Sequence, residues 1–459
     1  MSSTSDLQFS TGLPGLDRMM HGLMPGDNVV LHVAEVEDYE PFVMPFRDNT
    51  LAEGKKLIYF RFASHPPLVE HDSGAEIHEL HPEEGFERFI TETIDVIERG
   101  GRGACYIFDC LSELAVDWYS DRMLGNFFML ACPYLYKLDT IAYFALLRNH
   151  HSPFAIDAIM NTAQVYMNVY RHKDDLYLHP LKVDKRFSST MYTLNHWEDG
   201  DFKPVRDSAI TAAILTETPH PWLDFTIHRP GVWMQTFAAA RKALDEKGAA
   251  AAVDESTRLL YQRLLRMAIT RDEKISALTE QYFSLADLVR ILQRMIGTGL
   301  IGGKSLGMLL ARAILTTEKP AWSEMLEPHD SFFVGSDVFY TYLVQNDCWW
   351  LRRRRHDTKL ETLLENASVA RERILRGAFP DDIEHQFMEM LNYFGQSPLI
   401  VRSSSLLEDN YGNAFSGKYE SVFCANQGTP AERLEAFKAA VRTVYASTMS
   451  RDALTYRAH

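Results

Sequence analysis

Four short apolar runs alternate with amphipathic segments over the first half of the chain. Each run is short and is bounded by turn residues, so each predicts a buried β-strand. The four runs are Val29–Val33, Leu57–Phe60, Ala104–Asp109 and Ile141–Leu147. Segments with helical spacing lie between them, of which Gly85–Arg99 is an example. This alternation predicts a largely parallel α/β sheet domain over residues 1–225.

The rest of the chain is richer in helical patterns. Residues 226–296 contain an alanine-rich link at Gly248–Val253 and two helical patterns, Thr257–Ile269 and Ser284–Ile296. Ser284 is followed three residues later by Asp287, which is close to a capping box. We expect a helical connector here. Residues 297–459 mix helices with one clear strand, Pro398–Val401, so the chain is expected to be an α/β multidomain protein in three parts.

Composition narrows the functional classes. The formal net charge of -15 disfavours nucleic acid and anionic membranes as partners. No apolar run is long enough to span a bilayer, and Met1–Ser10 lacks a signal-peptide pattern. The five cysteines include no C-x-x-C pair, which favours reduced thiols in the cytoplasm. The histidines match no strong metal-ligand spacing, and no serine lies in a G-x-S-x-G motif, so neither a metal site nor hydrolase chemistry is expected.

A glycine cluster at residues 297–305 is the first candidate for chemistry. Gly302, Gly303 and Lys304 precede a helical pattern, and glycines before a helix let the backbone approach phosphate oxygens. A Walker A loop would need glycine at position 298, where Thr298 stands, and would follow a strand rather than the helix expected here. The alternative is a glycine turn between two helices with an exposed lysine.

A second candidate begins at the strand Leu399–Val401, which runs into Arg402, Ser403, Ser404 and a third serine. Arginine at a strand end beside hydroxyls suits phosphate oxygens, although a salt-bridged structural arginine is an equal alternative. The acids Glu408 and Asp409 follow, with Gly412 and Gly417 available for a tight loop. A separate run, Arg352–Arg355 after Trp349-Trp350, reads as a solvated helix face.

With these motifs, the segment 297–459 resembles the nucleotide-binding domain of phosphoenolpyruvate synthase and pyruvate phosphate dikinase. The shared pattern is an apolar strand, Arg-Ser-Ser, an acidic pair, a turn with glycine, a Glu-Ser strand and a later helix. It is carried here by Leu399–Ser405, Glu408-Asp409, Phe415–Gly417, Glu420-Ser421, Ala446-Ser447 and Tyr456-Arg457, with Gly302–Lys304 upstream.

The resemblance implies part of an ATP-grasp-type α+β domain that binds ATP and Mg²⁺. Lys304 and Arg402 would contact the phosphates, and Gly302, Gly303, Ser403, Ser404 and Glu420 would complete the site. In the family the phosphoryl group passes to a histidine on a swivelling domain and then to pyruvate. That domain and the metal-binding acids have no visible counterpart up to His459, so no catalytic residue is assigned. The chain is expected to be either a portion of a longer phosphotransferase or a non-catalytic, nucleotide-sensing module.

Residues 8–200 resemble RecA-like ATPases of the circadian-clock KaiC type. The resemblance rests on Phe9–Asp17, Gly22–Asp27, Tyr106–Asp109 and Lys182–Arg186. The phosphate loop is missing, because Ala34–Pro41 has four acids and neither glycine nor lysine. We therefore expect a domain that does not bind ATP there, with Asp109 in a structural role. Such a domain could mediate homo-oligomerisation.

Overall fold

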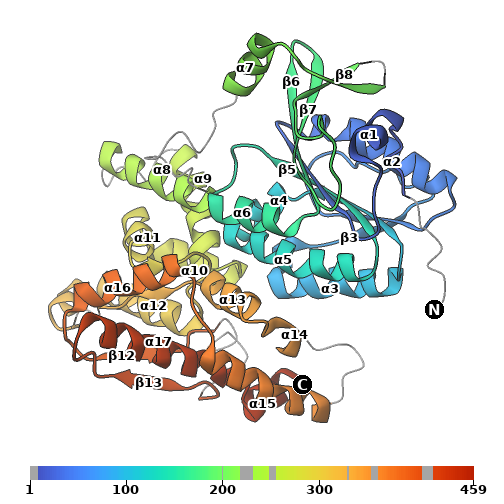
Figure 1. Ribbon diagram of the computed structural model, residues 1–459. Helices are drawn as coiled ribbons and strands as arrows, with labels where there is room; N and C mark the ends of the chain where they lie inside the picture. The colour runs from blue at the N-terminus through green and yellow to red at the C-terminus, as the bar shows by residue number, and fades with distance from the viewer. Residues whose placement is uncertain are drawn as a thin grey trace. The chain divides into compact units, whose positions relative to one another are not determined.

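The computed structural model describes residues 9–198, 200–217, 231–247, 255–327, 330–352, 360–405 and 417–458. The chain divides into two compact units, Met1–Val232 and Trp233–His459 (Figure 1). The three-part division expected from the sequence stays a prediction. The link Gly248–Val253 lies outside the described residues.

The first unit is built on one nine-stranded sheet with the order β3-β2-β4-β5-β1-β6-β7-β8-β9. Strands β1 to β6 pair in parallel, and β6 to β9 form an antiparallel extension. The predicted parallel sheet is confirmed, and each of the four predicted strands is present. The strands are β1 Asn28–Val33, β2 Leu57–Arg61, β3 Glu76–Glu79, β4 Cys105–Cys110, β5 Ile141–Leu147, β6 Val165–His172, β7 Asp175–Val183, β8 Asn195–Glu198 and β9 Asp201–Pro204.

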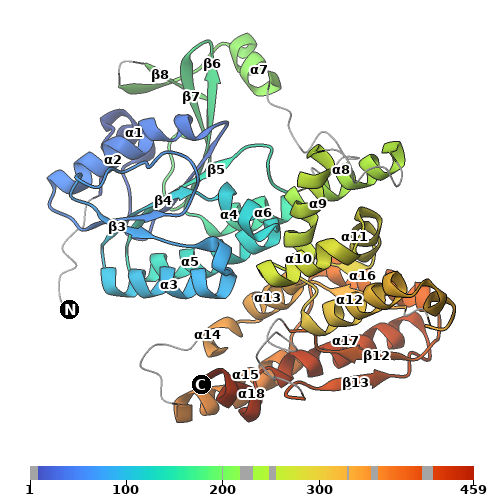
Figure 2. The ribbon, with the colours of Figure 1, turned by 180° about the vertical axis from the view of Figure 1, so that it is seen from behind.

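Helices cover both faces of the parallel part of this sheet (Figures 1 and 2). Leu16, Phe42 and Phe46 from the first two helices join one buried cluster with alternate strand residues. Aromatic rings of the next helices pack on the other face, as where Phe127 meets Phe108. The helices are α1 Pro14–Met20, α2 Glu40–Ala52, α3 Phe86–Gly100, α4 Ser112–Trp118, α5 Asp121–Lys137, α6 Pro153–Thr162 and α7 Ser208–Glu217, with 3-10 turns η1 Val36–Asp38 and η2 Pro82–Glu84.

The second unit is mainly helical. Its core combines buried residues of α13, α15, α16 and α17 with the inner side of a β-hairpin. The helices are α8 Val232–Lys247, α9 Glu255–Ala268, α10 Glu273–Tyr282, α11 Leu285–Leu292, α12 Gly303–Glu318, α13 Ser336–Gln345, α14 Trp349–Arg352, α15 Leu360–Arg376, α16 Asp381–Phe394, α17 Pro430–Ser447 and α18 Arg451–Ala458, with the 3-10 turn η5 Pro320–Glu324.

Two short strand pairs complete the second unit. Strand β10 (Met295–Ile296) pairs in parallel with β11 (Phe333–Val334), and β12 (Leu399–Arg402) pairs antiparallel with β13 (Ser421–Cys424). The expected helix Ser284–Ile296 is therefore too long. Its capping box at Ser284 is confirmed, but the helix ends at Leu292, because the last two residues hydrogen-bond across to β11. None of the described helices has the length and apolarity needed to cross a bilayer.

Candidate nucleotide-binding site

The glycine cluster of the second unit forms a loop between a strand and a helix. Strand β10 ends at Ile296, and helix α12 begins at Gly303 with Gly302 as its N-cap. The expectation that a helix leads directly into this loop is wrong, because α11 ends earlier and β10 intervenes. Gly302 has a φ of +80°, and a Cβ at this position would overlap the Ser404 carbonyl. Only glycine fits such a position without strain.

This close approach brings the two sequence candidates together. The Gly303 amide donates to the Ser405 carbonyl at 3.2 Å. The Ser305 amide donates to the Ser404 hydroxyl at 3.0 Å. Gly303 and Ser305 lie in the first turn of α12, where backbone amides and the helix dipole favour an anion. The Arg-Ser-Ser-Ser segment therefore lies directly against the amino end of α12.

Thr298, the residue that breaks the Walker pattern, anchors the loop. Its amide and its hydroxyl donate to the two carboxylate oxygens of Asp337, each at 2.7 Å. Asp337 is buried at the start of α13, and the Gln386 side chain accepts the Gly297 amide at 3.1 Å. A glycine at position 298 would lose the hydroxyl bond. The departure from the Walker pattern thus has a structural reason.

The remaining predicted site residues lie on the same two segments and directly before β13. Arg402 is exposed at the end of β12, opposite Ser421, whereas Ser403 is buried. Lys304 is half-buried in the first turn of α12. Glu420 precedes β13, and its carboxylate pairs with Arg371 of α15 at 3.1 Å, so its expected nucleotide contact stays a prediction. Four further candidates from the sequence lie outside the described residues, and they are Glu408, Asp409, Gly412 and Phe415.

The first unit carries the opposite chemistry at its own strand–loop–helix junction. After β1, the chain passes through η1 into α2, which begins at Glu40. Asp38 is buried there, and the guanidinium of Arg171 donates to it from Nε at 2.8 Å. A buried carboxylate of the chain itself, paired with a guanidinium, therefore lies at this junction.

Asp109 is fully buried at the carboxyl end of β4 and has four hydrogen-bond donors. The Arg61 guanidinium and the amides of Phe62 and Ala63 donate to one oxygen at 2.7 to 2.8 Å. The Tyr59 hydroxyl donates to the other oxygen. These contacts use the carboxylate to hold the end of β2 beside β4, which is the structural role expected for Asp109.

A buried chain of Ser112, His151 and Asp121 was not anticipated from the sequence. The Ser112 hydroxyl lies 2.7 Å from His151 Nε2, and Nδ1 lies 3.1 Å from the Asp121 carboxylate. The Leu147 amide also donates to the Ser112 oxygen, at 2.8 Å. All three side chains are buried, so in the described part of the chain the hydroxyl is closed to solvent. The order is that of a hydrolase triad, but the contacts tie the first residues of α4 and α5 to the loop before α6.

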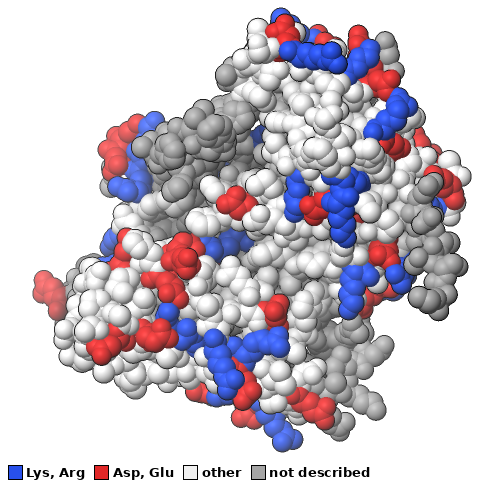
Figure 3. Space-filling view, in the orientation of Figure 1, with Lys and Arg blue, Asp and Glu red and all other residues white. Residues whose placement is uncertain are grey.

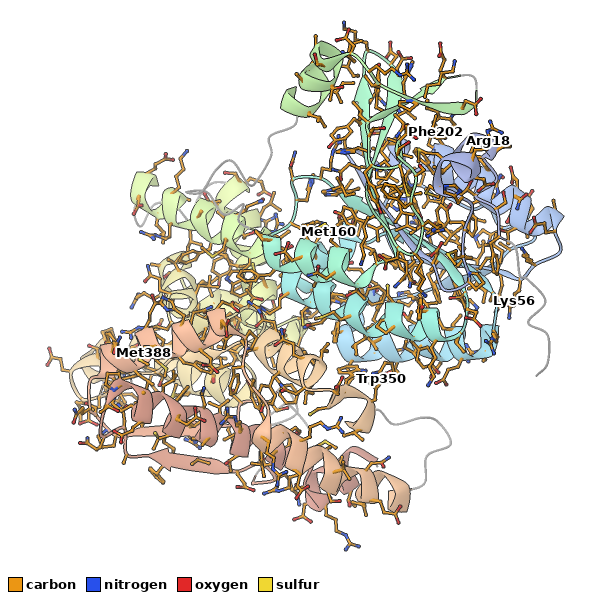
Figure 4. The ribbon with its side chains drawn as sticks, in the orientation of Figure 1. Arg18, Lys56, Met160, Phe202, Trp350 and Met388 are labelled. Carbon is orange, nitrogen blue, oxygen red and sulfur yellow. The ribbon has the colours of Figure 1, made fainter. Side chains whose placement is uncertain are left out.

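Other surface features of the described residues are weaker candidates for a site. Among the described residues, no group of three or more His, Cys, Asp or Glu side chains could hold a metal ion. A shallow hollow of the first unit lies between α1 and β9, where Arg18 and Phe202 are neighbours (Figure 4). Acidic and basic side chains are interspersed over the visible face (Figure 3). Trp350 lies on α14, and Arg353–Arg355 fall outside the described residues.

Comparison with known proteins places the second unit's site within a family domain. Residues 298–459 match the family model described as pyruvate phosphate dikinase, AMP/ATP-binding domain. This segment contains Gly302–Lys304 and the Arg402–Ser404 run. No curated protein matches the chain. The match supports an ATP-binding portion in the last third of the sequence.

Proposed function

We propose that residues 298–459 bind ATP with its phosphates at the amino end of α12. In this proposal the segment is the N-terminal, ATP-binding portion of a phosphotransferase similar to phosphoenolpyruvate synthase and pyruvate phosphate dikinase. The observation that carries the proposal is the packing of Gly302-Gly303 against Ser404-Ser405 inside the segment that matches the family. It brings the amino end of α12, which carries Lys304, against the serines that follow Arg402.

The donors have distinct roles in this proposal. Arg402 offers a planar fork that can hold two phosphate oxygens, and Lys304 offers a compact point charge. Ser403 and Ser404 add hydroxyls, and Glu420 lies on the neighbouring strand end. The described residues fit phosphates better than they fit a bare cation, so Mg²⁺ is proposed to enter as MgATP. The family resemblance implies that the phosphoryl group would then pass to a histidine carrier on a separate domain.

A second candidate is a nucleotide-sensing or oligomerisation module with a pseudo-ATPase domain. The acidic loop of the first unit favours it, because the buried Asp38 already neutralises Arg171 where a RecA-like domain would bind phosphate. In this version the RecA-like unit mediates homo-oligomerisation and the ATP-grasp-type unit senses nucleotide. All five cysteines are free and buried, which supports a reducing, cytoplasmic environment for either candidate.

Alanine substitutions at the two cationic residues test the phosphate site. Each charge-assisted contact contributes roughly 1.5–3 kcal/mol, so Arg402→Ala and Lys304→Ala should each weaken ATP about ten- to a hundredfold. Arg402→Lys should restore little, because an ammonium cannot reproduce the fork. Adenosine affinity should hardly change. Lys319→Ala is the matched control, because Lys319 is exposed at the other end of α12.

Isothermal titration of the full chain decides between the outcomes. We expect one bound ATP per chain, from the second unit alone. Unchanged ATP affinity in both folded mutants would mean that Lys304 and Arg402 do not bind the phosphates and have only structural roles. Residues 1–459 assayed alone should make no phosphoenolpyruvate from ATP and pyruvate, because in the family the histidine carrier lies on a separate domain. Sustained, pyruvate-dependent formation of phosphoenolpyruvate by the pure protein would contradict the proposal that this chain supplies only the ATP-binding portion.

A further inference from the structure

The β12–β13 hairpin has one apolar face that points away from its own core. Leu399 and Val401 pack against the core cluster of the second unit together with the buried Cys424. Successive strand residues point to opposite faces, so Ile400 and Phe423 lie on the outer face. They are exposed by 47% and 83%, which is unusual for an aromatic ring in the middle of a strand.

Register places these two side chains beside the proposed phosphate site. Ile400 pairs directly with Phe423, and Arg402 pairs directly with Ser421 on the same face. Ile400 and Arg402 are two positions apart on the same strand, so their Cα atoms are about 7 Å apart. A molecule held by Arg402 through its phosphates would therefore extend over Phe423 if it ran along the hairpin.

We propose that Phe423, backed by Ile400, is the stacking surface for the base of the nucleotide whose phosphates lie at Arg402 and the amino end of α12. This inference rests on the proposed function and adds the site for the base. The chemistry is complementary along one face, because a cation and hydroxyls meet the phosphates and an exposed ring meets a planar, apolar base. A second copy of the chain is the competing occupant, and it would need no charge at Arg402.

Paired ligands separate the contribution of the base from that of the phosphates. Stacking on an aromatic side chain strengthens binding roughly tenfold or more per base. Phe423→Ala should therefore weaken ATP about tenfold or more and leave inorganic tripolyphosphate unchanged. Arg402→Ala should weaken both ligands. Phe423→Trp should keep ATP affinity near that of the wild type, because a larger ring still stacks.

Phe187→Ala is the matched control, since Phe187 is also a highly exposed phenylalanine but lies in the first unit. It should change neither ligand. Titrations on the full chain, with melting curves to confirm folding, give the answer. Intact ATP affinity in Phe423→Ala overturns this inference alone, and so does a wild-type dimer that Phe423→Ala converts to monomer with unchanged ATP affinity. Failure of the wild type to bind either ligand overturns the proposed function as well.

Discussion

The two units contain the same local element, a strand that leads through a short loop into a helix, with opposite chemistry. In the first unit the loop between β1 and α2 carries Glu35, Glu37 and Asp38, and it has no glycine. In the second unit the loop between β10 and α12 carries glycines and leads into Lys304. Both helix ends favour negative charge. The first supplies that charge from its own side chains, whereas the loop of the second has no acidic residue and its Gly303 and Ser305 amides donate to the Ser405 carbonyl and the Ser404 hydroxyl.

This difference shows that the same strand–loop–helix element can occur with or without residues suited to binding a phosphate. The sheet of the first unit keeps its order with Asp38 paired to Arg171 and Asp109 held by four donors. Its polar groups at this edge stabilise the chain itself. The loop of the second unit instead places an uncharged serine hydroxyl against the first turn of α12, which carries Lys304. Three changes can test this contrast.

Asp109→Ala should have the largest effect, and only on stability. Removing one partner of a buried ion pair costs about 3–5 kcal/mol, because Arg61 and two amides lose their acceptor. Glu76→Ala, which breaks an exposed pair with Lys56, should cost less than about 1 kcal/mol. Chemical denaturation measures both. The ATP affinity of the folded Asp109→Ala protein should equal that of the wild type, and a loss of affinity would mean that the first unit binds nucleotide after all.

Gly302→Val should come next, and it should act on binding. A side chain here would collide with the Ser404 carbonyl and would require a positive φ, so the loop must move away from the Arg-Ser-Ser-Ser segment. We expect ATP affinity to fall at least a hundredfold, about 2.7 kcal/mol. Gly307→Ala in the same helix is the control, since its Cβ would meet nothing within 4 Å. Equal ATP affinity in the two variants would contradict the proposed site.

A decrease in pH should produce the smallest effect, which is a loss of stability in the first unit. Burial, together with the nearby Arg148 and His151, lowers the pKa of His32 from 6.5 to about 3, against the effect of the hydrogen bond that His32 Nδ1 donates to Asn168. The unfolded chain therefore binds the proton more tightly than the folded chain, and stability falls as pH drops below 6.5. Between pH 6.5 and 5 the loss should be about 1.6 kcal/mol.

Comparison with His32→Gln isolates this contribution, since glutamine does not titrate. Hydrogen exchange measured by mass spectrometry at pH 7, 6 and 5 would show which unit loses protection. The wild type should lose more protection than the variant, and the difference should fall in residues 9–217. Parallel pH profiles for the two proteins would exclude His32 as the cause.

Much of this architecture could be predicted from local patterns. Apolar runs bounded by turns are enough to predict β1, β2, β4 and β5, because buried parallel strands need little else. The strand β10 could not be separated from α11. Met295 and Ile296 continue the helical spacing of the preceding residues, and only pairing with β11 ends the helix. Tertiary hydrogen bonds decide such boundaries.

The candidate site was predictable only in part. Gly302–Lys304 and Arg402–Ser404 were both named as candidates from the sequence. The contact between the two segments depends on the tertiary fold, since no local sequence pattern links them. The chain Ser112–His151–Asp121 was not predicted, because its members come from two helix starts and a loop that are apart in sequence, and they match no spacing rule. The anchoring of Thr298 by Asp337 also escaped prediction. The sequence shows that Thr298 does not match the Walker pattern, but it does not show which residue Thr298 hydrogen-bonds.

The contact between Ser305 and Ser404 joins residues that are 99 positions apart in the chain. Closing a loop of that length is slow compared with forming a helix, so the amino end of α12 acquires its serine neighbours late in folding. On a ribosome that adds about 5–20 residues per second, roughly 5–20 s separate the synthesis of the glycine loop from that of β12. A nucleotide that needs both segments would therefore stabilise copies that have already folded, and it would not guide the early steps.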